Sequence, residues 1–275
     1  MVFSLKSLAL AATAIASVSA SCGHIYTGEV WGNVEVADFN YTETGGPLNW
    51  YGLNSTANKL CAKGKNQSPI VLDKRTKFLD DNSKVVMKVP KTSGGRMENI
   101  GDVVQVKTNG TLSFEGLNYT LSQFHFHTPS EHRIEEEYSP MEIHWVFQTP
   151  KKETAVVAFM FELNPYGYNP EVVDNIFHNL GGASEPGNYT KTEELEFDYF
   201  IDHLMHNPIY YYTGSLTTPP CTEGIKWLVS QVPLPLNVCT YNAVKRVLKY
   251  NARFTQNAIG EENLLSLAAS ELNGH

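Results

Sequence analysis

The sequence lacks any run rich in lysine and arginine, and its 275 residues carry a formal net charge of -8. A surface with that charge balance repels phosphate groups, so we do not expect nucleic acid as a partner. Internal repeats, low-complexity tracts and linkers are also missing. With 42% hydrophobic and 18% charged residues, the chain can bury a substantial core, and we expect one large domain.

The apolar run over residues 7–20 is shorter than the roughly 20 residues that a membrane-spanning helix needs. Lys6 precedes this run, and Val18-Ser19-Ala20 places small residues where signal peptidase cleaves. We therefore predict a secretory signal peptide over residues 1–20 and a secreted, extracellular domain over residues 21–275. Residues 261–275 lack the hydrophobic tail of a lipid-anchor signal, so no membrane anchor is expected and these residues are predicted to form a surface terminus.

Because the chain is predicted to be secreted, its four cysteines are expected to form disulfides. Cys22, Cys61, Cys221 and Cys239 form an even set in an oxidising compartment, which favours disulfides over a thiolate metal site and permits three pairings. Acceptor sequons for N-glycosylation point to the same compartment. They lie at Asn40, Asn54, Asn109, Asn118 and Asn188, and we predict a glycoprotein.

Short apolar or alternating runs dominate the pattern along the chain. Predicted strands cover residues 84–90, 102–108, 111–116, 121–127, 141–149, 153–163 and 225–234. Helices are predicted over residues 171–180, 195–204 and 240–250, the last with Thr240 as N-cap. The expected fold is mainly β with peripheral helices (α+β).

Alternation within two of these strands brings histidines onto one face. Gln123, His125 and His127 share a face of the first strand, and Glu142 and His144 share a face of the second. A lone strand histidine is usually an ordinary hydrogen-bonded residue, but three that converge across paired strands suit zinc. Three ligands leave a tetrahedral position open, as catalytic sites require. Gln123 and Glu142 stand where they could orient the imidazoles.

Several separated motifs resemble those of the alpha-class carbonic anhydrases. They are "QSPI", "QFHFH", "SEH", "MEIHWV" and "GSLTTPP", and the resemblance extends from about Tyr41 to Arg253. It implies a large central twisted, mostly antiparallel sheet that carries a zinc site formed by His125, His127 and His144. It also implies a zinc lyase that hydrates carbon dioxide reversibly to bicarbonate and a proton, by attack of zinc-bound hydroxide.

The same resemblance assigns roles around the metal. Gln123 and Glu142 match partners of His125 and His144, while Thr217 matches a hydroxyl that donates to a carboxylate, here Glu131. Because an ionised carboxylate only accepts, Thr217 would accept from the metal-bound group. Thr218 matches a residue that helps to bind bicarbonate or anionic inhibitors. The resemblance also implies that sulfonamides inhibit the protein. The positions matching the apolar carbon dioxide pocket are Val146, Val156, Leu216, Ile225 and Trp227.

The path by which the proton leaves departs from the family pattern. Asn99 and Gln105 match its polar rim and Tyr41 a water-ordering tyrosine, but Asp102 stands where fast members carry a shuttling histidine. An exposed aspartate has a pKa of about 3.9, too acidic to accept a proton readily near neutrality. We therefore expect turnover limited by proton transfer.

His132 is expected to be a hydrogen-bonded structural residue and not a fourth ligand.

The resemblance also matches Cys61 and Cys221 to a disulfide found in many secreted members. Cys22 and Cys239 remain, and they could pair within the chain or form a covalent homodimer.

Two other functions are considered: an inactive secreted binding or adhesion module of the same fold, and secondary esterase activity. The retained histidines argue against the first, and no pocket signature for a larger acyl substrate supports the second.

Overall fold

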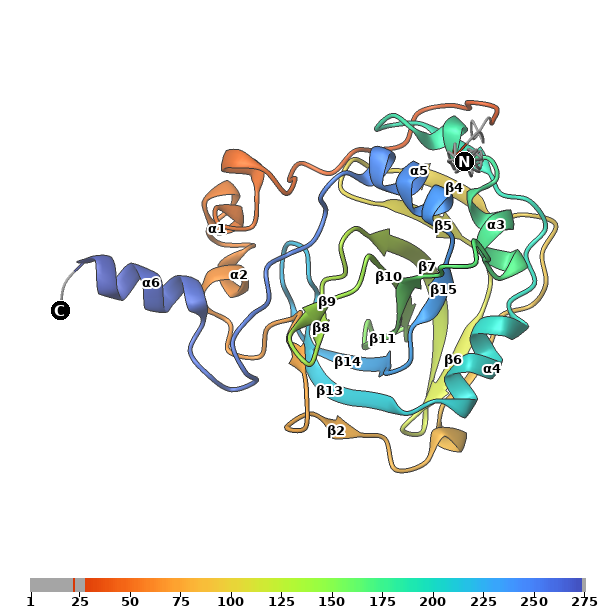
Figure 1. Cartoon of the computed structure of the whole chain (residues 1–275). Helices are drawn as coiled ribbons and strands as arrows, with labels where there is room; N and C mark the ends of the chain where they lie inside the picture. Colours follow the sequence, from red (N-terminus) through yellow and green to blue (C-terminus); the bar gives the residue numbers. More distant parts are fainter. Residues whose placement is uncertain (1–21, 23–27, 274–275) are drawn as a thin grey trace, which may run out of the picture.

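A large twisted sheet forms the centre of the molecule, with helices around it (Figure 1). The computed structural model describes Cys22 and residues 28–273, so the predicted signal peptide lies outside the described residues. The strands are β1 (Val71–Leu72), β2 (Lys77–Phe78), β3 (Val86–Lys88), β4 (Arg96–Asn99), β5 (Val104–Lys107), β6 (Thr111–Phe114), β7 (Leu117–His127), β8 (Arg133–Ile134), β9 (Glu137–Tyr138), β10 (Met141–Gln148), β11 (Thr154–Leu163), β12 (Tyr189–Lys191), β13 (Ile209–Ser215), β14 (Glu223–Ser230) and β15 (Leu234–Leu236). The helices are α1 (Trp50–Leu53), α2 (Lys59–Lys63), α3 (Glu171–Phe177), α4 (Asp198–His206), α5 (Val238–Leu248) and α6 (Leu264–Asn273), with 3-10 turns at Glu43–Gly45, Asn82–Lys84 and Leu180–Ala183.

The main sheet runs in the order β12-β4-β5-β7-β10-β11-β14-β13-β2. Its neighbours are antiparallel except where β11 meets β14, and β15 also pairs in parallel with β11. The long strands β7, β10 and β11 form the middle, and the register sets His144 opposite His125. Directly paired residues point to the same face of a sheet, so this register brings the histidines together. The predicted mostly antiparallel sheet is confirmed.

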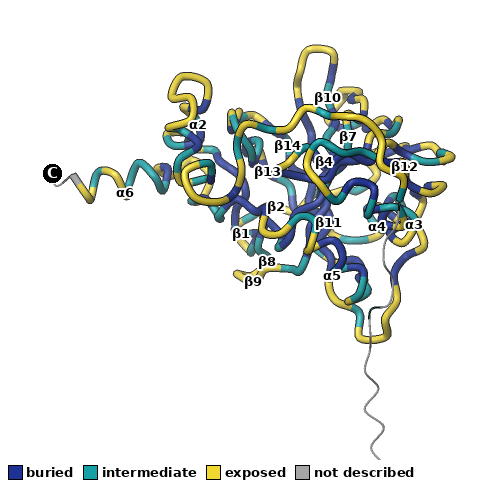
Figure 2. Tube along the Cα trace, turned by 90° about the horizontal axis from the view of Figure 1, so that it is seen from above, coloured by how far each residue is buried: buried dark blue, intermediate teal, exposed yellow. Residues whose placement is uncertain are grey.

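The two faces of the central strands pack differently. Phe124, Phe126 and Trp145 point away from the histidines into the main core, and all are essentially inaccessible. Helices α3, α4 and α5 contribute apolar residues to this core, and Figure 2 shows the central strands buried. Burying one such aromatic side chain stabilises the fold by about 1.5–3 kcal/mol. The strands that hold the site are therefore anchored from behind.

Helix boundaries differ from the predictions at several ends. The first predicted helix stops at Phe177, and the second starts at Asp198. The third begins at Val238 because Asn237 is its N-cap, accepting a hydrogen bond from Cys239 N at 2.7 Å. Thr240 is not the cap, since its hydroxyl accepts from Asn169 Nδ2 at 2.8 Å.

Other corrections concern strands and the carboxyl end. The predicted strand 225–234 is divided into β14 and β15, with Pro233 between them, because proline cannot donate to a sheet ladder. Residues 264–273 form α6, which packs against α2 through a hydrogen bond from Ser266 Oγ to Ala62 O at 2.7 Å. Helix α6 projects from the side of the molecule opposite to α4 (Figure 1).

Two disulfides join distant parts of the chain. Cys61 in α2 bonds to Cys221, as the family resemblance implies. Cys22 bonds to Cys239 in α5, which selects the intrachain alternative. Each thiol is consumed by the other, so the structure does not support a covalent homodimer through either residue. Within the described residues, no helix combines the length and apolarity needed to cross a bilayer.

Candidate metal centre

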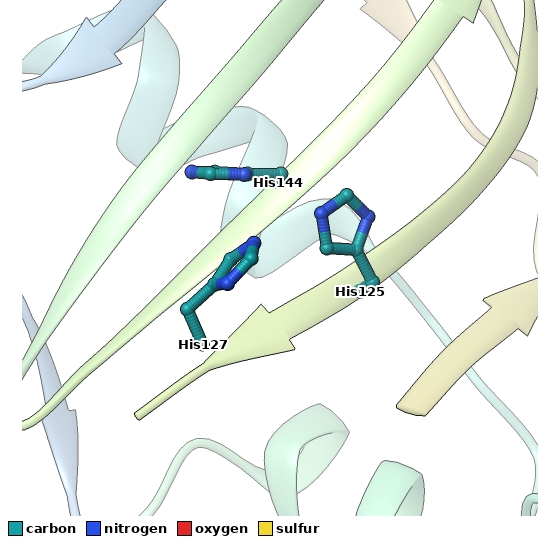
Figure 3. Close-up of side chains that lie close together, drawn as sticks. All are labelled: His125, His127 and His144. Atoms are coloured by element: carbon teal, nitrogen blue, oxygen red, sulfur yellow. The ribbon is translucent and has the colours of Figure 1, made fainter. Parts of the chain in front are cut away.

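Three histidine rings converge on one face of the central sheet. His125 and His127 extend from β7, and His144 extends from the neighbouring β10 (Figure 3). Their ring centroids lie 4.6 to 5.2 Å apart. One nitrogen from each ring lies within 4.8 Å of the others, which is the spacing that a single ion can bridge.

Two of the rings are oriented by side chains two positions earlier on the same strand. His125 Nδ1 lies 2.9 Å from Gln123 Oε1, and His144 Nε2 lies 2.7 Å from Glu142 Oε1. Both acceptors require the adjacent nitrogen to carry the proton. The lone pairs that remain are therefore on His125 Nε2 and His144 Nδ1, and both predicted partners are present.

The third ring is held by a group that the sequence did not reveal. His127 Nδ1 donates to the backbone carbonyl of Asn251, 124 residues away, at 2.7 Å. Its Nε2 is buried and has no hydrogen-bond partner. A buried acceptor without a partner is costly, so this nitrogen fits a site for a metal ion. No local pattern marks a backbone carbonyl at such a separation as a partner.

Burial sets the protonation states at this centre. Loss of solvent lowers the pKa of His125 well below its usual value, and burial also lowers that of His144. Both rings are therefore neutral near pH 7, as ligands to zinc must be. Burial would raise the pKa of Glu142, but the adjacent His132 and His144 outweigh it and hold that pKa well below its usual range.

A second cluster, His132, Glu142 and His144, also brings nitrogen and oxygen atoms together. Its atoms already bond to one another. His132 Nδ1 lies 2.7 Å from Glu142 Oε1, and its Nε2 lies 2.6 Å from the hydroxyl of Tyr212. The interpretation of His132 as a hydrogen-bonded structural residue is confirmed.

Glu131 brings a carboxylate to the edge of the histidine cluster. Its Oε1 accepts from Arg253 N at 2.8 Å, and its Oε2 lies 3.5 Å from His127 Nε2. Oε2 is buried and makes no hydrogen bond, so the bond from Thr217 that the resemblance implies is not formed in this structure. Thr217 is itself buried, in the segment after β13.

Apolar side chains gather beside His144. Val156, Ile225 and Trp227 belong to one buried cluster, and Val146 and Leu216 pack against it. The ring of Trp227 lies 4.8 Å from that of His144, centroid to centroid. Thr218 lies in the segment that follows, where its carbonyl accepts from Cys221 N at 2.8 Å. The arrangement places an apolar wall beside His144.

Comparison with known proteins agrees with this geometry. Residues 45–264 match the family described as eukaryotic-type carbonic anhydrase. The chain belongs to the carbonic anhydrase family. Its histidine triad is intact.

Relatives in the carbonic anhydrase family cover most of the chain. A fungal alpha carbonic anhydrase from Aspergillus oryzae is 49% identical, with a TM-score of 0.82 over 86% of this chain and 100% of that one. A carbonic anhydrase of Neisseria gonorrhoeae is 32% identical over 230 residues, or 82% of each chain. The alpha carbonic anhydrase of Thermovibrio ammonificans, solved with the inhibitor sulfanilamide, is 28% identical, with a TM-score of 0.70 over 80% of this chain and 96% of that one.

The rim of this carbonic anhydrase site corrects one prediction. Asp102 is only 8% exposed, and burial raises its pKa to about 6. The assumption of an exposed aspartate with an ordinary pKa was wrong, because the surrounding chain covers the residue. The buried hydroxyl of Tyr41 has no hydrogen-bond partner, and burial, then the charge of Glu131, raises its pKa well above the usual value.

The amides of the predicted rim are committed to other contacts. Gln105 lies opposite His125 in the sheet, and its Nε2 donates to Glu98 Oε2 at 2.8 Å. Asn99 donates to Ala183 O at 3.0 Å and accepts from Gly101 N at 3.0 Å. Asn99 therefore shapes the loop that carries Asp102, whereas Gln105 lies closer to the metal centre.

Proposed function

We propose that the protein catalyses the reversible hydration of carbon dioxide with a zinc ion held by His125, His127 and His144. The observation that carries this proposal is the convergence of three imidazoles whose other nitrogens are already hydrogen-bonded. Bound zinc supplies a Lewis acid that lowers the pKa of its water to about 7, a value for which carbonic anhydrase is itself the standard example.

Residues of the chain beside the metal site orient the reacting groups. Glu131 Oε2 is a buried acceptor without a partner. We propose that the hydroxyl of Thr217 donates a hydrogen bond to it during catalysis. With its proton so directed, the oxygen of Thr217 can only accept from a reacting group. Thr218 is assigned to binding bicarbonate and inhibitors, by likeness to the family.

Carbon dioxide is small and apolar, and we assign its binding to the apolar wall beside His144. That wall is formed by Val146, Val156, Leu216, Ile225 and Trp227. Water bound there would find few partners, so the wall favours an apolar molecule. Sulfanilamide binds the Thermovibrio ammonificans relative, and we propose that sulfonamides and anions inhibit this chain too.

Proton removal is proposed to limit turnover, for a reason that differs from the sequence-based one. A carboxyl with a pKa of about 6 can exchange protons near neutrality, but Asp102 is 8% exposed and meets bulk buffer poorly. The charges of Glu131 and Asp102 both raise the pKa of Tyr41, so its hydroxyl lies near these carboxylates. We assign Tyr41 to ordering water on this path.

Secretion and glycosylation complete the proposal. Two disulfides favour an extracytoplasmic location, and we propose a signal peptide over residues 1–20 followed by a single catalytic domain over residues 21–275. Four of the sequon asparagines are exposed and Asn188 is partly exposed. They are therefore accessible to glycosylation, which a mass shift on enzymatic deglycosylation would reveal.

The decisive experiment measures metal content and stopped-flow hydration of carbon dioxide, with and without a chelator. We expect about one zinc per chain, loss of activity on zinc removal and recovery on its return. His144→Ala should lose both the metal and the activity. A metal-free or inactive protein would contradict the proposal and would favour the binding-module alternative.

A further inference from the structure

Asn251 lies at a junction between the metal-binding strand and the loop that carries Asp102. It is 1% exposed, and its carbonyl accepts from His127 Nδ1 at 2.7 Å. Its side-chain Nδ2 donates to Phe126 O at 2.9 Å and to Asp102 O at 3.1 Å. Its Oδ1 accepts from Thr128 N at 2.7 Å. One buried residue therefore contacts both sides of a metal ligand and the neighbouring loop.

The loop that carries Asp102 is also held from its outer side. Gly101 has a φ of +93°, and a Cβ built on it would lie 2.5 Å from Val36 Cγ1. Ala37 N donates to Ile100 O at 2.8 Å. Residues 36 and 37 therefore pack on one side of the loop while Asn251 binds the other.

We propose that Asn251 is a positioning residue that couples the orientation of His127 to the position of the Asp102 loop. The carbonyl that fixes the imidazole and the amide that binds the loop belong to the same residue. A displacement of the loop therefore moves the acceptor that orients His127. The proposal deepens the proposed function, because it rests on His127 as a metal ligand.

Hydrogen bonding explains why asparagine suits this junction. The amide offers two donors and one acceptor within one rigid plane, and all three groups are engaged. Aspartate at this position would lose both donors and turn an oxygen toward two carbonyl oxygens. Alanine would leave the carbonyls of Phe126 and Asp102 without these donors.

The first test compares the rate of zinc release into excess chelator for Asn251→Ala and a matched control, Asn263→Ala. Asn263 is 4% exposed and uses the same groups, donating Nδ2 to Gly64 O at 3.0 Å and accepting from Leu265 N at 2.9 Å. It lies beside α2 and α6, away from the histidines. We expect Asn251→Ala to release zinc at least tenfold faster, and the control to remain within about twofold of the parent.

The second test asks whether the loop acts through Asn251. Gly101 has a φ of +93°, which residues with a Cβ rarely adopt, so Gly101→Ala strains the loop backbone. We expect it to accelerate zinc release about threefold in the parent and to have no further effect in Asn251→Ala. Fully additive effects, or equal zinc release from Asn251→Ala and Asn263→Ala, would overturn the proposal.

A third measurement avoids substitution of Asn251 and does not depend on metal. In nuclear magnetic resonance spectra of the metal-free protein, Gly101→Ala should shift the Nδ1 proton of His127 and leave that of His125 unchanged. Equal shifts, or no shift at His127, would refute the coupling. Because this spectrum needs no zinc, a protein that binds none would refute the proposed function while the role of Asn251 is still decided.

Discussion

Glu142 Oε1 lies 2.7 Å from Nε2 of His144, and this contact decides which nitrogen of His144 can face a metal. The same carboxylate accepts from His132 Nδ1 at 2.7 Å and from the backbone amides of Glu131 and His132. Four donors hold one buried anion in place. The orientation of the ligand therefore depends on a network and not on its strand alone.

Glu142→Ala should weaken zinc binding by about 10- to 100-fold, because the ring of His144 loses the acceptor that fixes its orientation. Competition with a chromophoric chelator measures the affinity. Glu98→Ala is the matched control, since Glu98 is also buried and charge-paired but contacts none of the three histidines in a hydrogen bond. Equal losses in the two variants would show that Glu142 has only a general structural role.

Asp102→Asn should stabilise the metal-free protein at pH 7 and have little effect at pH 4. The folded chain raises the pKa of Asp102 to about 6, so it holds the proton more tightly than the unfolded chain does. Stability therefore falls as the pH rises from about 4 to about 6, by about 3 kcal/mol in total. Asparagine removes this penalty. Urea unfolding at the two pH values measures the difference, and a gain of equal size at both would contradict the buried, proton-holding state.

Asp102→His should raise carbon dioxide hydration at low buffer concentration, because the longer histidine side chain reaches further toward solvent while its imidazole still exchanges protons near neutrality. In the parent protein, imidazole-type buffers should accelerate turnover in a concentration-dependent way. Stopped-flow assays across a buffer series check both effects. Turnover of the parent that is independent of buffer would remove proton transfer as the limiting step.

The paired substitutions Cys61→Ser and Cys221→Ser should lower both stability and activity. This disulfide closes a loop of 160 residues and holds the segment just after Thr217 and Thr218, so its loss should cost about 2–5 kcal/mol. Cys22→Ser with Cys239→Ser removes the other bond and serves as the comparison, with a loss of stability but a smaller change in turnover. Guanidinium unfolding and initial rates measure the two properties.

Much of the metal centre could be predicted from the local pattern of the sequence. Side chains alternate along a strand, so the spacing of His125 and His127 already placed both on one face, opposite Phe124 and Phe126. Gln123 and Glu142 could be found in the same way, because each stands two residues before its histidine. The predicted strands around these residues are present, since a run of alternating apolar residues forms a strand wherever one face is buried.

Other features depended on contacts between distant residues. The carbonyl of Asn251 binds His127 across 124 positions, and Arg253 N binds Glu131 across 122. The start of α5 could not be predicted from Thr240, because Asn169 binds its hydroxyl and Asn237 caps the helix. Burial of Asp102 likewise depends on the packing of the surrounding chain.

By itself, the sequence determined the fold class, the three candidate ligands and the face on which they lie, because strand periodicity is a local property. Only the tertiary structure decided which nitrogen of each ring is free, that Cys22 pairs with Cys239, and that Asp102 has a pKa of about 6. These properties arise from hydrogen bonds, disulfide bonding and loss of solvent between segments far apart in the chain, which no local pattern encodes.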